Sequence, residues 1–191
     1  MAVRADVPVI GIVSRLVGHK GLDLIREVME KSLWERDVQY VILGSGESQY
    51  ENFFNELAAR NPGRVGVYIG FNAKLAQHIY AGADIFLMPS RSEPCGLAQM
   101  VSCRYGTIPV IRETGGLKDS IHDSGDGYGN GFTFANYNAH ELYEACWRAK
   151  EGYWQKDGWP ILVKRAMECD FSWSNSAKSY EGLYNEVVNL W

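Results

Sequence analysis

Short apolar runs alternate with amphipathic stretches along most of the chain. Each run has the length of a buried strand and is closed by glycine, proline or polar residues. These runs predict strands over Val7–Val13, Val38–Leu43, Val65–Ile69, Ile85–Met88, Thr107–Ile111 and Phe132–Phe134. Between the strands, apolar residues recur at helical spacing and predict helices over Leu22–Leu33, Tyr50–Ala58, Ala73–Ala81, Gly96–Tyr105 and Leu117–Ile121.

Strands that alternate with helices predict a parallel sheet covered on both faces. We therefore expect an α/β fold, a Rossmann-like doubly wound parallel sheet of about six strands. The chain has 191 residues, with no repeat or linker that would divide it, so residues 1–191 are expected to form a single domain. From about residue 139 the pattern is helical, with breaks near 158–160 and 171–173, and 123–131 is expected to be a long flexible loop.

The last predicted helix carries an apolar stripe. Its members are Tyr180, Leu183, Tyr184, Val187, Val188 and Trp191. Such a stripe is expected to bury itself against another element, and we favour docking on the helix's own domain. The alternative is that part of it faces a partner domain.

Composition excludes several classes of protein. Hydrophobic residues make up 46% and charged residues 22%, as in an ordinary soluble domain, and the net charge of −4 argues against a general nucleic-acid binder. No apolar run is long enough to span a membrane, and the N-terminus lacks the apolar core of a signal peptide. The four cysteines have no metal-ligand spacing and are expected to be free thiols in a reducing compartment.

The stretch from Ser90 to Gly106 holds the strongest candidate chemistry. The strand Ile85–Met88 runs into a loop that feeds a helix, and open α/β sheets bind their ligands at such places. A helix N-terminus there, near Gly96 and Leu97, suits a phosphate because its N–H groups are unpaired. The carboxylate of Glu93 would repel a phosphate, so we expect it to contact hydroxyl groups of the same ligand.

Arg15 and Lys20 follow the first predicted strand in a loop that contains Gly18. A planar guanidinium and a compact ammonium can together neutralise a diphosphate. Two cations in a loop are more often solvated surface groups, but their place at the carboxyl end of a strand favours a ligand role.

Four further features have both a binding and a packing interpretation. Phe71, at the end of the third strand, could stack on a base or belong to the core. Cys95 could be a nucleophile, but no base is identifiable beside it, and a packing role is favoured. Thr114, Gly115 and Gly116 could let the backbone approach a ligand or simply start a helix. Gly44-Ser45-Gly46 is read as a tight turn that could line the same crevice.

Taken together, the motifs closely resemble those of bacterial glycogen synthases and plant starch synthases, which belong to glycosyltransferase family five. The matching stretches run in order through nearly the whole chain: Ser14-Arg15-Leu16, Lys20-Gly21, Gly82-Ala83-Asp84, Pro89-Ser90-Arg91, Glu93-Pro94-Cys95-Gly96-Leu97, Tyr105-Gly106-Thr107, Thr114-Gly115-Gly116-Leu117 and Phe171-Ser172-Trp173.

The resemblance implies the GT-B arrangement, in which two Rossmann-like domains face each other across a cleft. This chain resembles the C-terminal, nucleotide-sugar-binding half only. The family's acceptor groove lies on the other, N-terminal domain. The start at Met1-Ala2, just before the first strand, reads as the start of an excised domain.

The resemblance further implies transfer of glucose, with retention, from ADP-glucose or UDP-glucose to the non-reducing end of an α-1,4-glucan. No cofactor or metal is implied, and the location would be the cytoplasm, or the plastid of a plant. The excised domain is expected to bind nucleotide and to make little or no glucan.

The resemblance also assigns roles by position. Arg15 and Lys20 would hold the diphosphate, and Glu93 would contact the transferred glucose. Backbone near Cys95, Gly96 and Leu97 would meet the phosphate or ribose. Phe71 would stack on the base, where relatives often have Tyr. The pocket would be lined by Thr114, Gly115 and Gly116.

Three positions set this sequence apart from relatives. His19 stands where Gln is common, and Ala98 where a Thr hydroxyl next to the donor is common, which puts donor affinity in question. Val101 stands where some related glycosyltransferases carry a second Glu, which favours the synthases. The alternatives are a stand-alone nucleotide or phosphosugar-binding module and a related hexosyltransferase with another acceptor.

Overall fold

The computed structural model describes residues 4–33 and 38–190 of the chain. Its centre is a six-stranded sheet in the order β3-β2-β1-β4-β5-β6, and every neighbouring pair of strands is parallel. This is the strand order of the Rossmann fold. The strands are β1 (Val9–Val13), β2 (Gln39–Gly44), β3 (Val65–Ile69), β4 (Ile85–Met88), β5 (Ile108–Arg112) and β6 (Phe132–Phe134). The predicted doubly wound α/β fold is confirmed, and each strand lies within two residues of its predicted ends.

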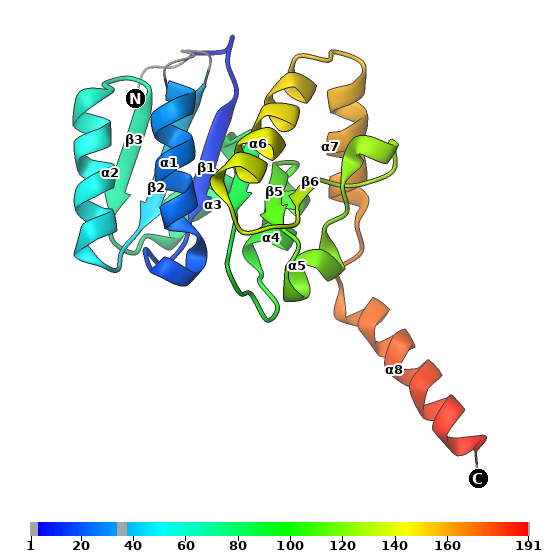
Figure 1. Ribbon diagram of the computed structural model, residues 1–191. Coiled ribbons are helices and arrows are strands. Elements are labelled where there is room, and N and C mark those ends of the chain that lie inside the picture. The colour runs from blue at the N-terminus through cyan, green and yellow to red at the C-terminus, as the bar shows by residue number, and fades with distance from the viewer. Residues whose placement is uncertain (1–3, 34–37, 191) are drawn as a thin grey trace.

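Eight α-helices connect or follow the strands in the described residues: α1 (Leu22–Ser32), α2 (Ser48–Arg60), α3 (Ala73–Gly82), α4 (Ala98–Tyr105), α5 (Gly115–Ser120), α6 (Ala139–Tyr153), α7 (Gly158–Glu168) and α8 (Trp173–Val188). In Figure 1, α1 and α6 lie on one face of the sheet and α3 and α4 on the other. Both faces are therefore covered, as the apolar strands require. No helix among the described residues is long and apolar enough to cross a membrane.

The starts of α4 and α7 have local structural reasons. The helix predicted from Gly96 begins at Ala98, because Gly96 takes the left-handed conformation, with φ of 74°. The expected break near 158–160 is confirmed: α6 ends at Tyr153, and Gly158-Trp159-Pro160 forms the first turn of α7. Proline is tolerated in the first turn, where its missing N–H has no helical partner to lose.

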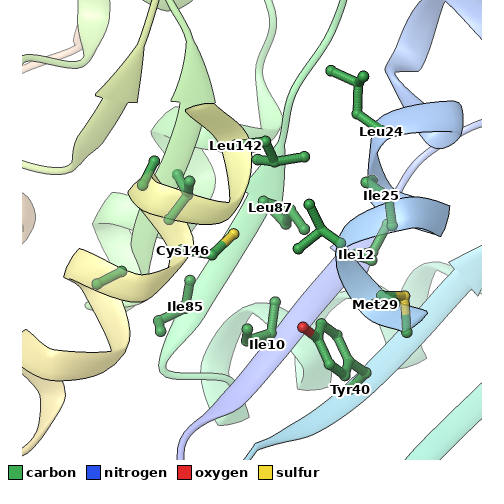
Figure 2. Close-up of a cluster of buried hydrophobic side chains, with 14 of the residues drawn as sticks. Ile10, Ile12, Leu24, Ile25, Met29, Tyr40, Ile85, Leu87, Leu142 and Cys146 are labelled. Carbon is green, nitrogen blue, oxygen red and sulfur yellow. The ribbon is translucent and has the colours of Figure 1, made fainter. Parts of the chain in front are cut away.

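The core under α1 and α6 explains why the strand sequences are so apolar. Figure 2 shows side chains of β1 and β4, such as Ile12 and Leu87, meeting Ile25 of α1 and Leu142 of α6. All four are buried. This packing fixes β1 and β4 as adjacent central strands, and the loops that leave them therefore lie side by side.

The last helix does not pack as predicted. No residue of α8 is buried, and Tyr180, Leu183, Tyr184 and Val188 remain exposed. Figure 1 shows α8 pointing away from the sheet. Docking of this stripe on its own domain is therefore wrong: the faces of the sheet are already covered by α1 to α7, and the segment before Trp173 leads the chain away from them. Trp191, the last member of the stripe, lies outside the described residues.

The 123–131 loop is organised by polar side chains. The Asp123 carboxylate accepts hydrogen bonds from the main-chain N–H groups of Gly125 and Thr133, at 2.9 and 2.8 Å. The Asn130 side chain bonds the N–H of His122 and the carbonyl of Ser120. The loop is therefore tied down at both ends.

Candidate functional site

The crevice lies where the strand order reverses. β1 pairs with β2 on one side and β4 on the other, and the chain connections run in opposite directions from these two central strands. Ligands of open α/β sheets bind at this switch point, beyond the carboxyl ends of the strands. The loops after β1 and β4 meet here, joined by a hydrogen bond of 2.8 Å from the Arg91 N–H to the His19 carbonyl.

The loop after β1 is held closely against its neighbours. Leu16 is fully buried, and its N–H donates to the Ser45 carbonyl at 2.9 Å. Gly21 has φ of 75°, and a Cβ there would lie 2.1 Å from the Pro89 carbonyl oxygen. Only glycine allows this close approach, which brings the cationic loop against the loop after β4.

Arg15, Lys20 and Glu93 line one cavity of about 230 Å³ at this switch point. The start of α4 lines it as well, through Gly96, Leu97 and Ala98. The structure thus brings together three charged side chains that are far apart in the sequence. This arrangement is compatible with the ligand roles expected for the two cations and Glu93, and those roles stay predictions.

Lys20 and Glu93, which both line the cavity, form an ion pair with each other. Their side chains are only 15% and 11% exposed, and the Ser90 hydroxyl donates a further hydrogen bond to Glu93 Oε2 at 3.2 Å. Glu93 is thereby held in one orientation. An ammonium has three N–H donors, so Lys20 can bind this carboxylate and an anionic ligand oxygen together.

Arg15 and the start of α4 supply the rest of the positive potential. Arg15 is exposed and has no ion pair with any described residue. Leu97 caps α4 without a side-chain hydrogen bond, so the first N–H groups of the helix have no side-chain acceptor. Such N–H groups and the helix dipole favour an anion.

A second cavity of about 240 Å³ adjoins the first and shares Arg15 with it. It is lined by the Gly44-Ser45 turn and by Gly70 and Phe71. Phe71 is 91% exposed, which excludes the core interpretation of this residue. Base stacking by Phe71 stays a prediction.

The other predicted site residues, Cys95 and Thr114 to Gly116, do not line either cavity. Cys95 is exposed but is absent from the lining of both. Gly115 and Gly116 pack against the loop after β4: a Cβ would lie 2.2 Å from the Glu93 carbonyl oxygen at Gly115 and 2.4 Å from that of Cys95 at Gly116. Thr114 precedes them as the cap of α5. The backbone that lies against Gly115 and Gly116 is that of the loop after β4. Direct contact of Thr114, Gly115 and Gly116 with a ligand stays a prediction.

The departures from the family pattern also have places in the structure. Ala98 lines the first cavity and brings no hydroxyl to it. His19 is exposed and contributes its main-chain carbonyl to the contact between the two loops. The Gln-to-His change therefore leaves that contact intact.

Sequence reasoning missed several residues that support the loop after β4. Ser90 is fully buried, and Arg112 and Gln99 bond main-chain atoms of the loop. Tyr137 donates a hydrogen bond to Asp23, and the Arg91 guanidinium lies 4.4 Å from the centre of its ring. Burial and the neighbouring Asp23 carboxylate raise the pKa of Tyr137 to about 12. Arg112 had one signal in the sequence, a charge at the carboxyl end of a strand.

Metal binding has no candidate group in the part of the chain that the structure describes. No three His, Cys, Asp or Glu side chains there are grouped to hold an ion. The absence of a metal requirement stays a prediction.

A doubly wound sheet with a cationic crevice at its switch point defines the class of Rossmann-like folds that bind nucleotides or their phosphates. Residues 2–153 match the family model of glycosyl transferases group 1, and the chain belongs to this family.

The chain is also similar to individual glycogen synthases and to a starch synthase. The chain is 51% identical to a glycogen synthase of Bacillus cereus (strain B4264) over 187 residues, and 52% identical to one of Desulforudis audaxviator over 186 residues. These matches cover 97% and 96% of this chain but 39% and 37% of the relatives. The catalytic domain of starch synthase IV from Arabidopsis thaliana, solved with ADP and acarbose, is similar in structure, with a TM-score of 0.87 and 36% identity over 99% of this chain and 40% of that one.

Proposed function

We propose that this chain is the donor-binding part of a retaining glucosyltransferase of the glycogen and starch synthase kind. In the full-length enzyme it would bind ADP-glucose or UDP-glucose, and glucose would pass to the non-reducing end of an α-1,4-glucan held by the other domain. The chain spans about two fifths of the glycogen synthases that it matches, so alone it is expected to bind nucleotide and to elongate little glucan.

One observation carries the proposal: Arg15, Lys20 and the N-terminus of α4 converge on one cavity at the switch point. Breaking the bond between glucose C1 and the phosphate oxygen leaves negative charge on the diphosphate. Fixed cations and N–H groups stabilise that charge without having to reorganise. The arrangement therefore suits a leaving diphosphate.

Glu93 is proposed to accept hydrogen bonds from hydroxyl groups of the transferred glucose. The carboxylate lines the cavity within reach of Lys20 and is fixed by the Ser90 hydroxyl. Lys20 would then bind Glu93 and a phosphate oxygen at once, and place the sugar next to the diphosphate.

The base is proposed to occupy the second cavity, against Phe71. That cavity joins the first at Arg15, so a nucleotide could extend from one into the other. An aromatic ring stacks on adenine or uracil. ADP in the Arabidopsis starch synthase favours adenine. The expected cytoplasmic location is part of the same proposal.

Calorimetric titration with ADP, UDP and ADP-glucose tests the proposal. We expect the chain to bind ADP, and Arg15→Ala to weaken it by about tenfold or more, since a charge-assisted hydrogen bond contributes roughly 1.5–3 kcal/mol. Arg60→Ala is the matched control, because Arg60 is an exposed arginine in the last turn of α2. Equal affinities in the unaltered chain and Arg15→Ala would refute the assignment of Arg15, and no binding of any of the three ligands would refute nucleotide binding by this chain.

A further inference from the structure

Most main-chain carbonyl groups of the loop after β4 accept hydrogen bonds from residues that do not line the cavity. Three donors account for six of them. The Arg112 side chain donates to the carbonyls of Ser90 and Arg91. The main-chain N–H of Gly116 donates to those of Glu93 and Pro94. The Gln99 side chain donates to those of Cys95 and Gly96. None of the three donor residues lines the cavity that holds Lys20 and Glu93. The carbonyl oxygens that reach them are therefore turned away from it.

Arg112 fixes the start of the loop. It ends β5, and its Nε and Nη2 donate to the carbonyls of Ser90 and Arg91 at 3.1 and 2.6 Å. Its Nη1 donates to the Ala135 carbonyl at 3.2 Å, which ties the loop to the chain after β6. A planar guanidinium can bond three separate carbonyls in one plane, whereas the compact ammonium of lysine on a flexible stem cannot reproduce that geometry.

Gln99 fixes the end of the loop. Its side chain is fully buried in the first turn of α4, and its Nε2 donates to the Cys95 and Gly96 carbonyls at 3.2 and 3.1 Å. Its Oε1 is buried without a hydrogen-bond partner among the described residues. Reversing the amide would place Oε1 against both carbonyl oxygens, so these carbonyls fix its orientation.

An unpaired buried acceptor is costly, and such groups are rare in folded proteins. In Gln99 the unpaired Oε1 belongs to the same amide whose Nε2 holds the Cys95 and Gly96 carbonyls away from the cavity. Free carbonyl oxygens would repel a phosphate, whereas the cavity side of the loop offers the N–H groups at the start of α4 to the phosphate, and Glu93 to the proposed sugar.

We propose that Arg112 and Gln99 are positioning residues for donor binding, which hold the loop from Ser90 to Gly96 by its carbonyl groups. They keep negative oxygens away from the diphosphate and fix the backbone that carries Glu93 and the N-terminus of α4. This inference rests on the proposed function for the identity of the ligand, but the rigidity of the loop is a property of the protein alone.

The test uses Arg112→Lys and Gln99→Met, two variants that keep the length of the side chain and lose donors. Each is titrated with ADP, and amide hydrogen exchange of residues 90–97 is measured without nucleotide. We expect an ADP dissociation constant about tenfold higher, and exchange about tenfold faster, in each variant, since a lost hydrogen bond corresponds to up to about a tenfold change.

Arg148→Lys is the matched control. Arg148 donates hydrogen bonds to the Asp123 carboxylate and to the Thr133 carbonyl in β6, and none of these bonds reaches residues 90–97. We expect it to lower the melting temperature and to leave ADP affinity and exchange of residues 90–97 unchanged. If either Arg112→Lys or Gln99→Met fails to fold, the other variant still tests the proposal.

Unchanged ADP affinity and unchanged exchange in both variants would overturn the proposal. An equal loss of ADP affinity in Arg148→Lys would also overturn it, because the loss of affinity would then be caused by lower stability and not by the loss of hydrogen bonds to the loop. If the unaltered chain does not bind ADP, the proposed function fails, and faster exchange in the two variants would still support the holding of the loop by these side chains.

Discussion

At the scale of single residues, the site depends on main-chain atoms that approach closely. Gly116 shows this most directly. A Cβ at this position would lie 2.4 Å from the carbonyl oxygen of Cys95 and 2.6 Å from its Cα, closer than real Cβ contacts. Backbone atoms cannot move aside as the end of a side chain can, so this glycine keeps α5 in contact with the loop that carries Glu93.

Gly116→Ala is therefore expected to destabilise the protein. Forcing a methyl group against fixed backbone costs roughly 1–3 kcal/mol. Urea denaturation of the variant measures this as a lower free energy of unfolding. Gly182→Ala is the control, because a Cβ at Gly182 in α8 meets nothing within 4 Å. Equal stability of the two variants would contradict the contact.

At the scale of elements, α8 differs from every other α-helix of the described chain in burying no residue. Its apolar stripe predicted a packed helix, and the periodicity was sufficient to locate the helix but not the surface that it meets. An isolated helix of 16 residues is only marginally stable in water. The helix therefore contributes little to the stability of the sheet and its layers.

Truncation of the chain after Asp170 tests this directly. We expect the melting temperature to change by less than about 2 °C, because no buried apolar surface of the core is lost. Leu162→Ala is the comparison: Leu162 of α7 is 5% exposed, and its truncation should cost about 2–5 kcal/mol. A fall in melting temperature as large in the truncated chain as in Leu162→Ala would show that α8 packs on the domain.

The connection between α5 and β6 depends on the charge of Asp123. Burial alone would raise the pKa of its carboxyl group, but hydrogen bonds from Arg148 and from the N–H groups of Thr133 and Gly125 outweigh it and lower the pKa. A lowered pKa in the folded state means that the stabilisation is present above the unfolded pKa of about 3.9 and is lost as the pH falls through the folded value.

Asp123→Asn is expected to lower the free energy of unfolding at pH 7 by about 1–2 kcal/mol, a modest value because the pair with Arg148 is about a third exposed. The difference from the unaltered chain should shrink below about pH 4. Urea denaturation at pH 7 and pH 3 measures the difference in the free energy of unfolding. Asp119→Asn is the control, because Asp119 is exposed. A difference that is the same at both pH values would contradict a role for the charge.

At the scale of the whole molecule, sequence patterns predicted most of the fold and the centre of the site. Apolar runs located every described strand; most residues of five of these strands are buried, and the edge strand β3 is only partly buried. The placement of Arg15 and Glu93 after the strands that became β1 and β4 was enough to favour a ligand role for each. Both inferences rest on local periodicity and on a general rule for parallel sheets.

What the sequence did not predict depends on contacts between distant segments. Arg112 and Gln99 have no spacing that marks them as partners of the loop after β4, since their role depends on the register of β4 with β5 and on the start of α4. The exposure of Phe71 and of α8 likewise depends on what surrounds them, and periodicity does not report that.

The central claim is that a nucleoside diphosphate binds in the crevice between the loops after β1 and β4. Chemical-shift mapping of the ¹⁵N-labelled chain with ADP tests it most directly. We predict that the amide signals which move belong to residues 14–20, 44–46, 70–72 and 93–98, and that those of α7 and α8 stay in place. Shifts confined to α6, α7 or α8, or no shift at millimolar ADP, would contradict it.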